Sequence, residues 1–288
     1  MIVFEDVFMG GIYNTLNWVW SLITFQSAWY HNYFWGLILI SLIVWGLEIL
    51  FPWRKQQGIF RKDFWLDGFY MFFNFFLFTI FISGIYALFS NLINFLGFNI
   101  TDFAVLNIQK LNPATQLLVF FVISDFFQWF THVLLHRYDF FWKFHQIHHS
   151  VKEMGFAAHL RYHWMENILY KPLKTFAIML LGGFEPEQAY IVHFIAICIG
   201  HLNHSNLNIT WGPLKYVFNN PVMHLYHHAY NLPKNKKYGV NFGISLSLWD
   251  YIFRTYYIPK VDENTKLGFK GDENIPTSFW KQLWVGFR

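Results

Sequence analysis

Charged residues are scarce in this chain of 288 residues. Asp, Glu, Lys and Arg make up 13% of it, whereas 55% of the residues are hydrophobic and 23% are aromatic. Soluble domains contain about 25% charged residues. The composition therefore excludes a surface that faces water throughout, and it favours helices in contact with lipid.

Cysteine is nearly absent as well. Cys198 is the only one, which excludes a disulfide within the chain and a thiolate metal site. The net charge is +4, and the basic residues form short clusters beside apolar runs. That pattern is typical of membrane topology and not of a nucleic-acid-binding surface, so we expect no nucleic-acid partner.

Five apolar segments are candidates for crossing a bilayer, which takes about 20 helical residues. They are residues 33–53, 67–98, 115–136, 172–184 and 186–204. The last two are expected to form a hairpin that is transmembrane or re-entrant. We predict an all-α integral membrane bundle of about four or five such helices.

The chain divides into three regions by composition. Residues 1–115 are expected to form interfacial and transmembrane helices, and residues 116–258 contain every histidine except His31. Residues 259–288, where charge, Gly and Pro increase, are expected to be a cytoplasmic tail.

A basic loop orients the bundle. Arg54, Lys55, Arg61 and Lys62 follow the first apolar segment, and basic loops favour the cytoplasmic side. If this loop is cytoplasmic, the third segment and the hairpin both end on that side. We therefore expect a multi-pass protein in which nearly every histidine, and with them the active site, lies on the cytoplasmic face.

Histidine is abundant, in contrast. There are 14, and all but His31 lie between residues 132 and 228. They form one H-x-x-x-H motif, two H-x-x-H-H motifs and a pair that closes the fifth apolar segment. The members are His132 and His136; His145, His148 and His149; His224, His227 and His228; and His201 and His204. Helical spacing predicts that each motif points its imidazoles into one small volume.

This number of imidazoles indicates metal. Imidazole is a ligand for zinc, copper, iron and nickel, and a zinc site closes with four ligands. The histidine motifs offer twice that number or more, so they predict a site for two ions. Without metal, such a cluster would bury many polar groups that each need a partner.

At this point the sequence resembles the fatty acid hydroxylase/sterol desaturase superfamily of membrane di-iron enzymes. The resemblance extends over nearly half the chain, and its histidine motifs follow the order typical of the family. The matching pieces are Asp125-x6-His132-x3-His136-Arg137, His145-x2-His148-His149-Ser150, Arg161-x-His163-x2-Glu166, His204-Ser-Asn206, Pro221-x2-His224-x2-His227-His228, and residues 248–256 with Trp249 and Asp250. Arg254 departs from a Gly usual in the family, and Trp164 from a frequent Pro.

The resemblance implies that residues 116–258 are the catalytic region and that the membrane bundle is capped by cytosolic helices that hold the metal site. It also implies a reaction and its requirements. The enzyme would use O₂ and two iron ions to hydroxylate or desaturate a lipid of the sterol, fatty acyl, carotenoid or alkylglycerol class, and zinc may replace iron in isolated protein. We expect electrons from a separate donor of the cytochrome b5 or ferredoxin type. The implied ligands are His132, His136, His145, His148, His149, His204, His224, His227 and His228.

Other polar residues leave alternatives open. His201 is either a further ligand or a hydrogen-bond donor near the site, and His163 is a ligand or a neighbour of one. Asp125, Glu166 and Asp250 are candidates to accept an imidazole N–H, and each has an alternative in an ion pair or a helix cap. His159 is expected at the periphery, and His193 to hydrogen-bond within the bundle.

Two other functions fit parts of the pattern. A zinc membrane hydrolase would need a general-base carboxylate at the metal and fewer histidines. A metal transporter would spread ionisable residues through the membrane depth, whereas here the histidines gather at one predicted face.

Overall fold

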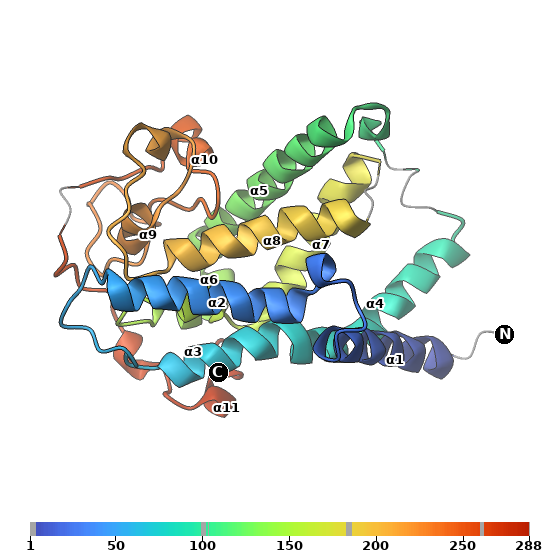
Figure 1. Cartoon of the computed structure of the whole chain (residues 1–288), viewed down its shortest axis with the longest axis horizontal. Helices are drawn as coiled ribbons and strands as arrows, with labels where there is room; N and C mark the ends of the chain where they lie inside the picture. The colour runs from blue at the N-terminus through green and yellow to red at the C-terminus, as the bar shows by residue number, and fades with distance from the viewer. Residues whose placement is uncertain (1–3, 99–101, 103, 183–185, 260–261, 288) are drawn as a thin grey trace.

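The computed structural model describes residues 4–98, 102, 104–182, 186–259 and 262–287. Its long helices lie side by side, and the short helices α9 and α10 gather at the end opposite the N-terminus (Figure 1). The helices of four or more residues are α1 (Phe4–Ile23), α2 (Tyr33–Leu50), α3 (Phe64–Phe72), α4 (Phe78–Phe95), α5 (Pro113–Arg137), α6 (Asp139–His149), α7 (Trp164–Leu180), α8 (Pro186–Asn203), α9 (Pro221–His227), α10 (Leu248–Ile252) and α11 (Phe279–Gln282), with 3-10 turns η5 (Phe156–Leu160) and η6 (Gly212–Tyr216).

The prediction of an all-α membrane protein is confirmed. The described residues contain no β-strand, only the isolated bridges Phe218–Leu246 and Ala229–Leu267. Three helices are long and apolar enough to span a membrane, over Tyr33–Leu50, Phe64–Phe95 and Pro113–Arg137. In the most apolar stretch of 18 residues in each helix, between 17% and 28% is buried inside the protein. Most of the surface of these helices is therefore left for lipid. The hairpin predicted over 172–204 corresponds to α7 and α8, and residues 183–185 at its turn lie outside the described residues.

Asparagine caps begin three of the helices. Asn32 accepts a hydrogen bond from the amide of Trp35, Asn112 from that of Thr115, and Asn220 from that of Met223. Such a cap satisfies one of the amides that a first turn leaves without a partner. A proline at the first helical position follows Asn112 and Asn220, where its missing N–H costs nothing. The caps fix the start of α5 and α9, which both carry histidines.

The second spanning helix is interrupted by a π-helical segment, η2 (Phe73–Leu77), between α3 and α4. Such a single π turn, bonded i→i+5, inserts one extra residue into an α-helix, and such turns are frequent at functional sites. Here the segment buries Asn74, whose amide donates to the carbonyl oxygens of Leu160 at 3.0 Å and Tyr162 at 2.8 Å. It therefore ties the spanning helix to the segment that leads into α7.

Helices α1 and α4 approach closely through glycine. A Cβ on Gly84 would lie 2.6 Å from the ring of Phe8, and one on Gly11 would lie 2.7 Å from Ala87. Both distances are too short for carbon atoms, so only glycine allows this packing.

Two of the cations in the basic loop are buried. The Arg54 backbone amide donates to Asn206, and its guanidinium donates to the carbonyl oxygen of Thr265. Arg61 pairs with Asp67 at 2.6 Å. Of the four cations in this loop, Lys55 and Lys62 are exposed, so the loop is weaker evidence for the orientation than the sequence implies.

Candidate metal centre

Two consecutive helices supply five of the histidines. His132 and His136 lie one turn apart in the last two turns of α5. Helix α6 begins two residues after α5 ends and carries His145, His148 and His149. The tight junction folds α6 back so that the rings of His136 and His149 lie 4.6 Å apart.

The remaining histidines come from the α8 and α9 region. His204 follows the last residue of α8, and its ring nitrogen Nδ1 bonds the carbonyl oxygen of Gly200 at 2.8 Å. His224 and His227 lie on the short helix α9, and His228 caps it. Helix α9 is buried along its whole length, so its imidazoles point into the protein.

Nine histidines meet in two groups, within each of which one ligand atom per residue lies within 4.8 Å of all the others. The five-histidine group is His132, His136, His145, His149 and His227, and the four-histidine group is His148, His204, His224 and His228. The nine are the ligands that the family resemblance implies, and His201, the tenth histidine of the sequence motifs, lies in neither group. Each H-x-x-H-H motif is split between the groups, so it does not point three imidazoles into one volume as expected.

The outer nitrogens of several rings are held by backbone carbonyls. Nδ1 of His132 bonds the carbonyl oxygen of Phe242 at 2.7 Å. Nδ1 of His227 bonds the carbonyl oxygen of Val240, also at 2.7 Å. A ring that donates Nδ1–H outward keeps the lone pair of Nε2 directed inward. This is the tautomer in which a histidine binds metal through Nε2.

The inner nitrogens fit a bound cation. In the four-histidine group, Nε2 of His204 lies 2.8 Å from Nε2 of His224 and 3.3 Å from that of His148. Lone pairs at such distances repel unless a proton or a cation lies between them. In the five-histidine group, Nε2 of His136, His149 and His227 is buried and has no hydrogen-bond partner among the residues that the structure describes. A buried polar atom without a partner is costly, and a metal ion would satisfy it.

Burial also keeps these rings in the neutral form that binds metal. Loss of water lowers the pKa of His148 to about 3. Burial, followed by the neighbouring imidazoles, lowers the pKa of His149 and His228 well below the usual value.

Glu166 is the carboxylate that touches a cage histidine. Its Oε2 lies 3.0 Å from Nδ1 of His145, and both side chains are buried. Its Oε1 accepts a longer bond of 3.3 Å from the amide of His163. Burial raises the pKa of Glu166 to about 8, and a nearby metal cation would favour its ionised form.

Asp125 and Asp250 support the cage through the backbone, without a bond to an imidazole. Asp125 accepts from the amides of Ser245 and Leu246 and from the indole of Trp249. Asp250 accepts from the amides of Phe242 and Gly243, at 2.9 and 2.8 Å. Since Phe242 also holds His132, Asp250 fixes the loop that orients this ring.

The other histidines considered as ligands lie outside both groups. Nε2 of His163 bonds the carbonyl oxygen of Leu283 at 2.9 Å, and its Nδ1 accepts from the amide of Met165. Nε2 of His201 lies 3.3 Å from Ser41 Oγ, and its Nδ1 lies 2.9 Å from Nδ1 of His159. Both nitrogens of each ring are thus engaged elsewhere. His193 stacks on the ring of Phe75.

A cavity of about 310 Å³ borders both groups of histidines. His132 and His145 of the five-histidine group line it, as do His148 and His204 of the four-histidine group. Much of its remaining wall is apolar, with side chains that include Trp18, Phe75, Leu160, Ala196, Ile197 and Ile244. One apolar molecule in this cavity would contact both groups.

A second cavity of about 190 Å³ lies against the first, between α5 and α8. Both cavities are lined by Tyr33, Gln128, His193 and Ala196. Sequence reasoning singled out His193 only as a residue bonded within the bundle. It did not identify Tyr33, Gln128 or Ala196, because nothing in their spacing distinguishes them from lipid-facing or core positions.

Comparisons with known proteins agree with this geometry. Residues 117–255 match the model of a family described as fatty acid hydroxylase. The chain is 30% identical over 170 residues to an ornithine lipid hydroxylase of Rhizobium tropici, covering 59% of this chain and 50% of that protein. It is 28% identical over 190 residues to an alkylglycerol monooxygenase of Caenorhabditis elegans, covering 64% and 35%.

A methylsterol monooxygenase of Arabidopsis thaliana is 27% identical over 148 residues, covering 49% of this chain and 46% of that protein. The matches thus span half or less of the length of these curated relatives. No solved structure matches.

Proposed function

Because this chain belongs to the fatty acid hydroxylase/sterol desaturase superfamily, we propose that it is a membrane oxygenase that uses O₂ and two iron ions to hydroxylate or desaturate a lipid. The observation that carries the proposal is the cavity bordered by both groups of histidines. A C–H bond held there would lie beside both ions.

The nine histidines are the proposed ligands, five for one ion and four for the other. Iron would supply the redox chemistry that an unactivated C–H bond requires and that acid–base side chains lack. The protein holds the rings through carbonyl oxygens and Glu166, so that the inner nitrogens stay deprotonated. The apolar wall excludes water and orients the substrate.

The second cavity is the proposed site of the lipid chain. It extends along α5 from the shared Gln128 to Phe120 and along α8 from His193 to Ala189. From His132 to Phe120, α5 rises about 18 Å at 1.5 Å per residue. Together the cavities provide an apolar path of this order, away from the histidines and between two helices.

We assign the catalytic chemistry to residues 116–258, preceded by the membrane and interfacial helices of 1–115. In the region 259–288, which we propose to be a cytoplasmic tail, the amide of Gly268 donates to the carbonyl oxygen of His228 at 3.0 Å. We place the active site on the cytoplasmic face, and we propose an external electron donor of the cytochrome b5 or ferredoxin type, because O₂ reduction consumes electrons that lipid oxidation does not fully supply.

A zinc hydrolase is less well supported. Its general base would need a carboxylate oxygen free to activate water at the metal. Both oxygens of Glu166 accept hydrogen bonds from His145 and His163, and Asp125 and Asp250 bond to backbone amides and indoles.

An oxygen-uptake assay separates the two functions. Protein in lipid nanodiscs would be loaded with Fe²⁺ or Zn²⁺ and given total lipid extract, O₂ and a chemical reductant. We expect iron-loaded protein to consume O₂ and yield lipids that gain one oxygen atom or lose two hydrogen atoms by mass spectrometry. Zinc cannot change oxidation state, so zinc-loaded protein should be inactive. Lipid hydrolysis by the zinc form, without oxidation by the iron form, would contradict the proposal.

A further inference from the structure

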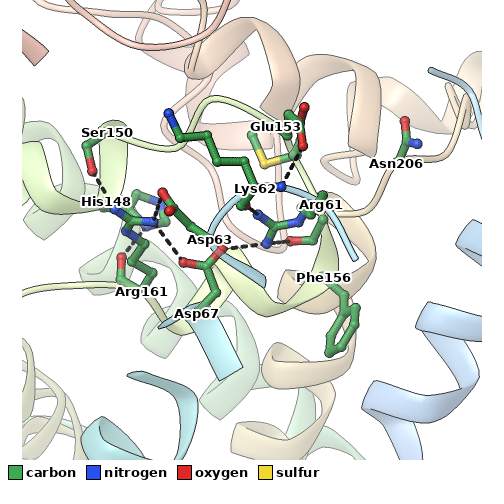
Figure 2. Close-up of polar contacts among 12 residues, drawn as sticks. Arg61, Lys62, Asp63, Asp67, His148, Ser150, Glu153, Phe156, Arg161 and Asn206 are labelled. Atoms are coloured by element: carbon green, nitrogen blue, oxygen red, sulfur yellow. Dashed lines mark hydrogen bonds and ion pairs between the residues drawn. The ribbon is translucent and has the colours of Figure 1, made fainter. Parts of the chain in front are cut away.

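A buried network of charges lies outside the histidine cage (Figure 2). Asp67, on α3, has a fully buried side chain and bonds two arginines. Its Oδ2 lies 2.6 Å from Nη2 of Arg61, and its Oδ1 lies 3.0 Å from Nη1 of Arg161. Asp63, which is partly exposed, accepts a second bond from Arg161 at 3.0 Å. Two arginines and two aspartates balance the charge.

Arg161 connects this network to one ligand. Its Nη2 donates to Oγ of Ser150, at the C-terminal end of α6, at 3.0 Å. Its own carbonyl oxygen bonds Nδ1 of His148, also at 3.0 Å. The guanidinium therefore fixes both the end of the helix that carries His148 and the carbonyl that orients its ring, as Figure 2 shows.

Helix α6 also carries His145 and His149 of the five-histidine group, but the ring nitrogen that Arg161 bonds directly belongs to His148. Four other rings bond different partners through Nδ1. The partners are Phe242 for His132, Val240 for His227, Gly200 for His204 and Glu166 for His145. None of these four partners belongs to the network of Asp67. A disturbance of Asp67 should therefore reach the four-histidine group first.

The backbone is shaped to accommodate the network. A Cβ on Gly155 would lie 2.2 Å from Nε of Arg61, so only glycine lets the guanidinium lie there. Buried ion pairs contribute little net stability, because desolvation offsets their attraction. Stability alone is therefore a poor explanation for four charged groups at this position.

We propose that Asp67 is a positioning residue for the metal centre, acting through Arg161 on His148 to set the metal affinity of the four-histidine group. This inference rests on the proposed function, since it needs the histidines to be ligands. Asp67 itself touches neither metal nor substrate.

The test compares Asp67→Asn with wild-type protein and with Asp272→Asn as a matched control. Asp272 pairs with Lys152 near the end of α6 and accepts from the amide of Phe269. In the described residues, neither member of this pair bonds an imidazole nitrogen of the cage, so the control removes a similar ion pair without changing a bond to a ligand. Apoprotein would be titrated with Co²⁺ against a chelator, with the visible absorption of each bound ion as the readout. We expect Asp67→Asn to weaken one of two Co²⁺ sites about 10-fold, the low end of the range for partners of metal ligands. The second site and the control should stay unchanged.

Arg161→Lys is a second variant in case Asp67→Asn folds poorly. Lysine keeps the charge but lacks the planar fork that holds Asp67 and Ser150 together, so the same single site should weaken. Two sites of wild-type affinity in both variants would overturn the inference, as would parallel loss of both sites with a lower melting temperature. Failure of wild-type protein to bind Co²⁺ would instead overturn the proposed function, and the inference with it.

Discussion

Two neighbouring histidines on one short helix should affect different metal ions. His224 belongs to the four-histidine group and His227 to the five-histidine group, although both lie on α9. We therefore expect His224→Ala and His227→Ala to weaken different sites. The pair is well matched, because the two variants remove the same side chain from the same buried helix.

The size of each effect follows from the number of ligands. Four-ligand protein sites bind zinc with about 10–16 kcal/mol at neutral pH, or roughly 3 kcal/mol for each ligand. His224→Ala leaves three histidines, so its site should weaken by about two decades at ~1.4 kcal/mol per decade. His227→Ala leaves four, enough to close a site, so the loss there should be smaller, about tenfold.

Equilibrium dialysis against a series of chelator concentrations would measure both sites by elemental analysis. Wild-type protein should release its ions in two steps, and each variant should shift one step only. His31→Ala is the control, since His31 lies in neither group. If both variants shift the same step, or each abolishes both, then the division into two groups is wrong.

Three further predictions follow from the site and its setting. Glu166→Gln should weaken the five-histidine site about 10–100-fold and leave the other site unchanged in the same dialysis, because Glu166 contacts His145 alone in the cage; loss of the four-histidine site would contradict this. Ala196→Phe should narrow the junction of the two cavities and shift the oxidised products towards shorter chains by mass spectrometry, whereas an unchanged distribution would place the chain elsewhere. In a Cys198→Ala background, single cysteines at Lys55 and Lys237 should label from one side of the membrane, and one at Asn107 from the other. The reason is that histidines on opposite faces, about 30 Å apart, could not share a metal centre. Labelling of Lys55 and Lys237 from opposite sides would refute the topology.

The histidine cage could be predicted from spacing because helical periodicity and ligand chemistry are local. The H-x-x-x-H motif on α5 places two rings one turn apart, whatever surrounds them. The division of each H-x-x-H-H motif was not predictable in this way. Adjacent helical residues point about 100° apart, so His148 and His149 face different groups once tertiary packing fixes α6.

The supports of the cage could be predicted less well. Every residue has a carbonyl oxygen, so no pattern distinguishes Phe242 or Val240 from its neighbours. Among the carboxylates, Asp125, Glu166 and Asp250 were all candidates to accept an imidazole N–H, and the sequence did not distinguish them. The structure turns Asp125 towards Ser245 and Trp249, and it is Glu166, on another helix, that bonds a histidine.

The π-helical segment at residues 73–77 has a consequence for the phase of the helix beyond it. Deleting one residue there would restore a regular α-helix and rotate all that follows by about 100°. Gly84 would then turn away from Phe8, against which only glycine packs, while Asp67 before the segment would keep its arginines. The extra residue thus allows Asp67 to face its arginines while Gly84 faces Phe8, which a uniform α-helix of this length would not. The number of residues in this helix is therefore constrained even at positions where the type of side chain is not.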